Sequence, residues 1–126
     1  EKGAKRAILL PVSAPFHCAL MAPAAEAMAI ELAQVHIAAP VVPVVANVLA
    51  EPVVDPGQIR QLLVSQVTSM VRWRETVSWL GAQNVTDIWE LGAGKALSGM
   101  VRRIDRSITC RSVGDADDVV KAVESL

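Results

Sequence analysis

The sequence predicts an α/β fold with βαβ units and a largely parallel sheet. Short apolar runs alternate along the chain with longer segments of helical period, which is the pattern of parallel strands joined by helices. Proline or glycine marks several of the boundaries between them. Hydrophobic residues make up 52% of the 126 residues, enough for a substantial core in one domain or a large part of one.

The first element expected is a strand over residues 6–12, because this apolar run is short and contains a proline near its end. Residues 19–36 then change to helical period, with Leu20 and Met28 on one side. Between the two, a short loop presents His17. That order places the imidazole at the carboxyl end of a strand, where open α/β sheets collect catalytic groups. A loop histidine that only hydrogen-bonds the backbone remains the alternative.

The middle of the chain predicts a strand over residues 43–48 and a loop over residues 50–57. Asp55, followed by a proline, predicts a helix start with the aspartate as N-cap, and the helix should end near residues 67–69. Gln66 projects toward the apolar side of this helix, where its amide needs a partner. It also lies near the helix end, where backbone carbonyls lack intrahelical donors.

The C-terminal half continues the alternation. We expect a helix over residues 73–83, a strand over 86–91, a helix over about 95–105, a strand over 107–113 and a closing helix capped by Asp115. The turn at residues 92–95, Gly-Ala-Gly-Lys, lacks the third glycine of a dinucleotide fingerprint and the hydroxyl residue that follows a P-loop lysine. It therefore predicts a tight strand-to-helix connection, and we expect Glu90 and Lys95 to be structural.

Composition excludes several function classes. The chain has 12 basic and 13 acidic residues and a net charge of −1, which argues against a nucleic-acid partner; Arg102, Arg103 and Arg106 form a small local cluster only. No apolar run approaches the roughly 20 residues that cross a bilayer, so no membrane partner is expected and the protein should be soluble. Cys18 and Cys110 have no paired spacing, which suggests a reducing compartment.

The histidines and cysteines indicate neither a metal site nor a cysteine nucleophile. His17 and His36 have no carboxylate or thiolate at ligand spacing, so we expect no metal site. Cys18 is a poor candidate nucleophile, because the side chains of consecutive residues diverge and Cys18 could not share a proton with His17. Residues 1–6 lack an initiator methionine and the apolar core of a signal peptide, so Glu1 is not expected to be the native beginning.

One family resemblance connects these features. Residues 13–21 read Ser-Ala-Pro-Phe-His-Cys-Ala-Leu-Met and resemble the Ser-x-Pro-x-His-Cys-Ala-Leu-Met segment of the malonyl-coenzyme A:acyl carrier protein transacylases. The similarity runs colinearly from about residue 3 to residue 126. It includes residues 40–48, residues 64–73 with their Val-Arg-Trp ending, and the Glu-x-Gly-x-Gly-Lys-x-Leu turn.

The resemblance implies a division of the chain. Residues 1–12 would be the final strand of a small ferredoxin-like subdomain and its link. Residues 13–126 would be the C-terminal part of a large α/β-hydrolase-like acyltransferase subdomain. The Gly-x-Ser-x-Gly elbow that carries the family's nucleophile does not occur in this sequence, and neither does its Gly-Gln-Gly segment. We therefore expect the chain to be a fragment that lacks the serine and is inactive alone.

The resemblance also implies an activity and its residues. The family transfers a malonyl group from coenzyme A to the phosphopantetheine thiol of acyl carrier protein, through a malonyl-serine, in fatty acid synthesis. His17 would be the general base, and the backbone carbonyl of Gln66 would accept its Nδ1 proton. Phe16 would contact the acyl group, because the Ala-Phe-His order resembles a motif associated with malonyl selection.

The expected partners are malonyl-coenzyme A, holo acyl carrier protein and the missing N-terminal part of the enzyme, with no cofactor and a cytoplasmic location. The alternative is a non-catalytic α/β binding or interaction module in which the histidine loop is only a structural turn.

Overall fold

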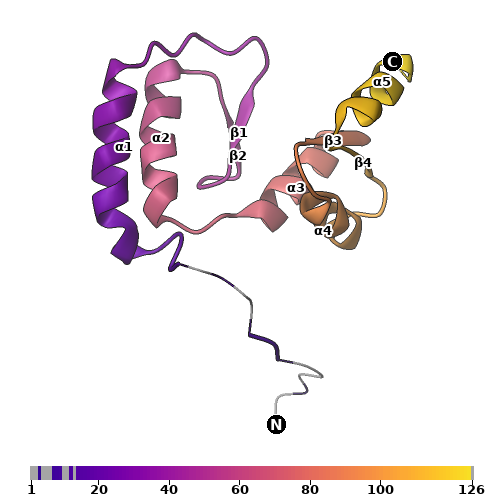
Figure 1. The fold of residues 1–126 in the computed structure, drawn as a ribbon, viewed down its shortest axis with the longest axis horizontal. Helices are drawn as coiled ribbons and strands as arrows, with labels where there is room; N and C mark the ends of the chain where they lie inside the picture. The colour runs from indigo at the N-terminus through magenta and orange to yellow at the C-terminus, as the bar shows by residue number, and fades with distance from the viewer. Residues whose placement is uncertain (1–2, 4–6, 10–11, 13, 126) are drawn as a thin grey trace.

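The computed structural model describes residue 3, residues 7–9, residue 12 and residues 14–125. Helices and strands alternate along most of it, which confirms the α/β character (Figure 1). A short 3₁₀ helix, η1, precedes the first α-helix. The elements are η1 Ala19–Met21, α1 Ala22–Gln34, β1 Val44–Ala46, β2 Glu51–Val53, α2 Pro56–Thr68, α3 Trp73–Ala82, β3 Asp87–Leu91, α4 Ala96–Ile104, β4 Thr109–Val113 and α5 Ala116–Glu124.

The helices α1 and α2 lie side by side, and the strands β1 and β2 form an antiparallel hairpin beside α2 (Figure 1). In the hairpin Val44 pairs with Val53 and Ala46 pairs with Glu51. The prediction of a loop over residues 50–57 is therefore wrong for Glu51–Val53. A tight turn, with Ala50 at a φ of 59°, returns the chain onto β1, and the two-stranded hairpin tolerates a proline in β2 because both strands are edges.

The strands β3 and β4 are parallel, in register from Asp87 with Thr109 to Leu91 with Val113, and α4 connects them. This βαβ unit confirms the strands predicted over residues 86–91 and 107–113. A single, largely parallel sheet is not what forms among the described residues, because they contain one antiparallel pair and one parallel pair.

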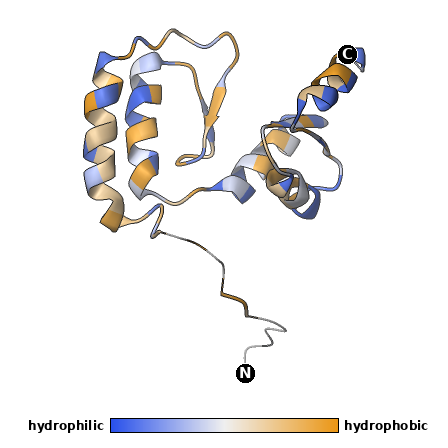
Figure 2. Ribbon diagram, viewed as in Figure 1, coloured by the Kyte–Doolittle hydropathy of each residue, from blue (hydrophilic) through white to orange (hydrophobic). Residues whose placement is uncertain are grey.

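The most buried core belongs to this second group of elements. Val77 on α3, Val101 on α4 and Ile108 before β4 pack together and are almost fully buried, with Trp73 and Ile88 against them. Burial of a side chain of this size contributes roughly 1.5–3 kcal/mol, so this contact fixes α3 and α4 against the strands. Figure 2 shows hydrophobic residues along both groups of elements. Several of them are exposed, among them Met28 on α1, Leu63 on α2 and Val119 on α5.

The strand predicted over residues 6–12 is wrong for the residues that can be judged. Residues 7–9 and residue 12 have no regular structure, and Leu9 is 96% exposed. Residues 6, 10 and 11 lie outside the described residues. An isolated strand leaves its backbone N–H and C=O groups without partners, and no described strand lies alongside this segment. The proposed division at residue 12 stays a prediction.

Both predicted helix caps are confirmed. The Asp55 carboxylate accepts a hydrogen bond from Gln58 N at 2.7 Å at the start of α2, and the Asp115 carboxylate accepts one from Asp118 N at 2.8 Å at the start of α5. The helix predicted over residues 19–36 begins as η1 and continues as α1. None of the helices in the described part of the chain is long and apolar enough to cross a bilayer.

Candidate functional site

His17 lies in a tight turn before η1. The turn is closed by Phe16 N, which donates to Ala14 O at 3.0 Å, and by the Cys18 thiol, which donates to Pro15 O at 3.0 Å. His17 itself has a φ of 56°, in the left-handed region that side chains with a Cβ adopt at a cost. A constrained turn at the start of a helix thus holds the imidazole. The Cys18 thiol donates its hydrogen bond to the backbone and not to the His17 ring.

The His17 ring contacts the end of α2. Its Nδ1 atom lies 2.9 Å from the backbone carbonyl oxygen of Gln66, 49 residues further along the chain. Gln66 is in the last turn of α2, where a carbonyl has no intrahelical donor, so it is free to accept. Because a carbonyl can only accept, Nδ1 carries the proton in this contact and Nε2 keeps its lone pair. This arrangement leaves Nε2 as the basic atom of the ring.

The Gln66 side chain holds the segment that follows α2. Its Nε2 atom donates to Ser69 O at 3.0 Å and reaches Met70 O at 3.5 Å. Thr68 Oγ1 donates to Ser65 O at 3.4 Å in the same turn. The amide therefore finds the partner that its position requires, while the main-chain carbonyl of the same residue faces His17.

Phe16 directly precedes the histidine and is 57% exposed. More than half of this residue's surface is therefore open in the described part of the chain. Phe16 shares the turn with His17, and its predicted contact with the acyl group stays a prediction.

An apolar pocket of about 210 Å³ lies beside Gln66, between α2 and the β1–β2 hairpin. Val45, Val53 and Leu62 are among its lining residues, and Asn47 is its other polar side chain. The Asn47 Oδ1 atom is buried without a hydrogen-bond partner. The sequence analysis did not single out Asn47, although a polar residue inside the apolar run at residues 43–48 is a signal that could have been used.

Arg72 is a second residue that the sequence analysis missed. Its Nη1 atom donates to Leu49 O at 2.8 Å, and its backbone N donates to Asn47 O at 3.0 Å. Its Nε atom pairs with Glu75 at 3.4 Å. Arg72 therefore ties the hairpin turn to the start of α3, and it does so across a sequence separation that no local pattern reveals.

The glycine turn connects β3 to α4 tightly, with Gly92 and Gly94 at φ values of 129° and 98°. Glu90 accepts hydrogen bonds from Leu97 N at 3.0 Å, from Ser98 N at 2.8 Å and from Ser98 Oγ. The Ser98 hydroxyl and amide hold the pKa of Glu90 below its ordinary value. A carboxylate thus occupies the first-turn amides of α4, which is a structural role and leaves no place for a phosphate.

The other histidine and the cysteines form no metal centre in this part of the molecule. His36 is exposed beyond the end of α1, and Cys18 and Cys110 are free thiols. Within the described ranges, no three His, Cys, Asp or Glu side chains lie close enough together to hold a metal ion.

Comparison with known proteins gives one consistent answer. No family model matches the chain. The malonyl CoA-acyl carrier protein transacylase of Salmonella typhimurium is 45% identical over 113 residues, which cover 90% of this chain and 37% of the relative. The protein of the same name from Escherichia coli K12 is 43% identical over 122 residues, which cover 97% of this chain and 40% of the relative. The chain corresponds to the C-terminal part of the malonyl CoA-acyl carrier protein transacylases.

Solved structures agree with this transacylase assignment. The acyl-carrier-protein-S-malonyltransferase from Bartonella henselae is 52% identical, with a TM-score of 0.88 over 98% of this chain and 40% of that one. A type II polyketide acyl carrier protein in complex with its malonyl-transacylase matches with 40% identity and a TM-score of 0.87 over the same shares. The chain thus spans about two fifths of the length of the transacylases that it matches.

Proposed function

We propose that this chain is the histidine-bearing part of a malonyl transacylase. That enzyme would move a malonyl group from coenzyme A to the phosphopantetheine thiol of an acyl carrier protein, in fatty acid synthesis. The observation that carries the proposal is the 2.9 Å contact between His17 Nδ1 and Gln66 O, in a chain that is 40–45% identical to proteins of that name. In this proposal the contact pairs the general base, His17, with the Gln66 carbonyl that orients its ring.

In the proposed reaction the basic atom is His17 Nε2. It takes the proton of a serine hydroxyl, supplied by a part of the enzyme outside this chain, as the serine oxygen attacks the malonyl thioester carbon. The tetrahedral intermediate collapses with cleavage of the carbon–sulfur bond, and His17 returns the proton to the coenzyme A sulfur. The pantetheine thiol then attacks the malonyl-serine ester by the same steps in reverse order.

Gln66 is a positioning residue in this scheme. Its carbonyl fixes which ring nitrogen of His17 carries the proton and aims Nε2 away from α2. The carbonyl is neutral, so it orients the imidazole without the full charge stabilisation that a carboxylate would give the imidazolium. The left-handed turn at His17 contributes to the same end, because it limits the positions open to the ring.

Phe16 is proposed to restrict the acyl group. Its half-exposed ring lies one residue before the base, so an acyl group held beside His17 would approach it. A bulky ring there would exclude an α-methyl branch by steric overlap.

The same proposal includes the division of the chain into residues 1–12 and 13–126. It also includes a cytoplasmic location, which suits two free thiols.

The test uses malonyl-coenzyme A and holo acyl carrier protein. The complete protein that carries this chain should form a covalent malonyl-protein and then malonyl carrier protein, both detected by intact mass. The 126-residue chain alone should form neither, because it lacks the serine elbow. Turnover by the chain alone would contradict the missing-serine proposal. No malonyl-protein from the complete protein would favour a non-catalytic binding module.

A further inference from the structure

The helix α2 ends without the residues that commonly stop a helix. It ends at Thr68, and residues 67–72, Val-Thr-Ser-Met-Val-Arg, contain neither glycine nor proline. Glycine stops a helix by adopting a left-handed backbone, and proline stops it by lacking an N–H donor. Ser69 instead has an extended backbone, with φ of −107° and ψ of 154°. Contacts with other parts of the fold therefore have to end α2 at this point.

The place where α2 ends matters for the carbonyl that contacts His17. In an α-helix the N–H of each residue donates to the carbonyl four residues earlier, so one further turn would bring Met70 N onto Gln66 O. Gln66 O now lies 2.9 Å from His17 Nδ1. The backbone of a further turn would lie where the ring reaches this oxygen. The contact with the imidazole thus depends on α2 ending before Met70.

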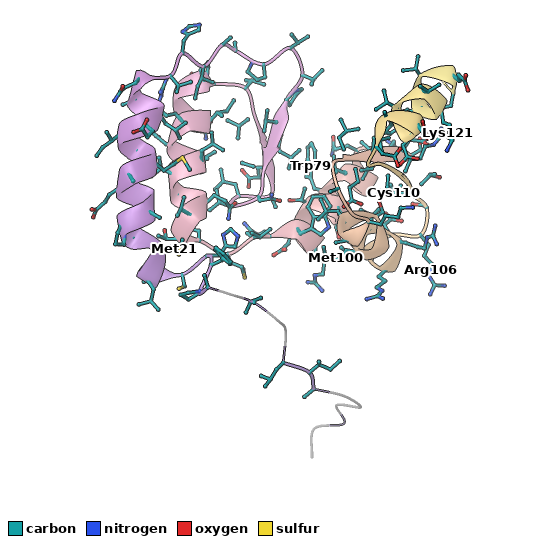
Figure 3. All side chains as sticks on the ribbon, in the orientation of Figure 1. Met21, Trp79, Met100, Arg106, Cys110 and Lys121 are labelled. Atoms are coloured by element: carbon teal, nitrogen blue, oxygen red, sulfur yellow. The ribbon has the colours of Figure 1, made fainter. Side chains whose placement is uncertain are left out.

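Apolar burial does not hold the connection from α2 to α3. Met70 is 67% exposed and Val71 is 38% exposed. Gln66 Nε2 donates to Ser69 O at 3.0 Å, which holds the connection from the α2 side. Figure 1 shows the connection between the two helices, and Figure 3 labels Met21 of η1 beside the end of α2. Polar contacts therefore fix the path of this segment.

Arg72 holds the connection from the α3 side. Its Nη1 atom donates to Leu49 O at 2.8 Å, and its backbone N donates to Asn47 O at 3.0 Å. Both acceptors belong to the hairpin turn, which is closed by its own bonds. Ala46 O accepts from Leu49 N at 3.0 Å and from Ala50 N at 2.7 Å, and Ala50 is buried. The Arg72 side chain thus ties the connection to a fixed point outside α2.

We propose that Arg72 is a positioning residue for the general base, because its anchor on the hairpin turn keeps Gln66 O available to His17 Nδ1. This inference rests on the proposed function. A guanidinium suits the task, since its planar fork places Nη1 on Leu49 O while Nε pairs with Glu75. The role goes beyond stabilising the fold, because the contact at Nδ1 sets which ring nitrogen carries the proton.

The experiment compares Arg72→Met with the unmodified form of the complete protein that carries this chain. Ring ¹⁵N chemical shifts at about pH 9, where an imidazole is neutral, report the tautomer of His17, and His17→Ala identifies its signals. Arg72→Met should change the Nδ1–H tautomer to a mixture. It should also lower the rate of malonyl-protein formation at saturating malonyl-coenzyme A roughly tenfold, because a displaced catalytic group is costly. Arg74→Met, at an exposed arginine on the same helix, is the matched control and should change neither.

A rescue variant tests the step from Arg72 to the end of α2. Met70→Pro, added to Arg72→Met, removes the N–H that a further helical turn would use. Proline also favours an extended backbone at the residue before it, as Ser69 already has. The double variant should regain the tautomer and most of the rate. Arg72→Lys, which has an ammonium donor without the planar fork, should lie between Arg72→Met and the unmodified protein.

The tautomer and the rate together decide the proposal, and thermal unfolding checks that each variant folds. Equal results for Arg72→Met and Arg74→Met would overturn it. So would a lower rate with an unchanged tautomer, or losses that Met70→Pro does not restore in a folded protein. If Arg72→Met does not fold, Arg72→Lys decides by the same two measurements. If the unmodified protein forms no malonyl-protein, the proposed function fails, and the His17 tautomer alone decides the role of Arg72.

Discussion

At the scale of single residues, one backbone carbonyl and one imidazole account for the proposed chemistry. The sequence analysis identified His17 from its loop and Gln66 from its place at a helix end, and the 2.9 Å contact brings both residues together. The resemblance to the transacylases was needed to connect them, because no local pattern links residues 49 positions apart. Arg72 was missed for the same reason, since its role depends on contacts with the distant hairpin turn.

The proposed role of Gln66 depends on its backbone carbonyl and not on its side chain. Gln66→Ala keeps the backbone carbonyl, so in the complete protein it should lower malonyl transfer by less than roughly tenfold, whereas loss of a positioned base costs about 10²–10⁴-fold. Steady-state kinetics with malonyl-coenzyme A and carrier protein measure this. A loss as large as that of His17→Ala in a folded Gln66→Ala variant would show that the side chain, and not the carbonyl, supports the base.

Phe16 has a separate test. Replacement of Phe16 by Ser in the complete protein should raise methylmalonyl transfer relative to malonyl transfer by roughly tenfold or more, because methylene-sized discrimination is worth about 1–3 kcal/mol. The ratio of the two kcat/KM values is the measurement. Leu20→Ser, at another exposed apolar residue just after the loop, serves as the control. An unchanged ratio in a folded, active Phe16→Ser variant would exclude a selective role for the ring.

At the scale of elements, local signals predicted helices better than strands. Both aspartate caps are where the sequence placed them, since capping depends on residues a few positions apart. β3 and β4 were also predicted, as short segments that alternate with stretches of helical period. β2 was not, because Glu51 and a proline give it no strand signal and only its pairing with β1 defines it. The run at residues 6–12 has the composition of a strand and no described partner.

The Asp55 cap fixes the start of α2, whose other end carries Gln66. Asp55→Ala should lower the free energy of unfolding of the complete protein by about 1 kcal/mol, within the 0.5–2 kcal/mol that such caps contribute. Chemical denaturation of the two proteins gives the difference. Asp87→Ala, at an exposed aspartate that caps no helix, should have a smaller effect. Equal effects of the two substitutions would argue against the cap.

Glu90 makes the β3–α4 connection sensitive to acid. Hydrogen bonds from Ser98 lower the pKa of Glu90 in the folded protein relative to the unfolded chain. Its stabilising contribution is therefore complete above the unfolded pKa and is lost as the pH falls through the folded pKa. Denaturation between pH 7 and pH 3 should show a smaller acid-induced loss of stability for Glu90→Gln than for the unmodified protein, with exposed Glu124→Gln as the control. Identical pH profiles for Glu90→Gln and the unmodified protein would contradict this.

At the scale of the whole molecule, the proposed catalytic histidine lies apart from the most buried core. Its most buried residues, Val77 and Val101, lie in the second group of elements, while His17 lies at the start of the first. Large apolar side chains such as Leu9, Val41 and Leu91 are more than two-thirds exposed. The chain spans about two fifths of the transacylases that it matches, and exposed apolar surface of this kind is typical of interaction sites.

The central claim is that His17 acts as the base that generates the serine nucleophile. It is tested most directly by the rate of malonyl-protein formation in the complete protein, measured by rapid quench with the unmodified protein and with His17→Ala. The account predicts a fall of about 10²–10⁴-fold for His17→Ala, with unchanged thermal unfolding. A folded His17→Ala variant that forms malonyl-protein at the unmodified rate would contradict it.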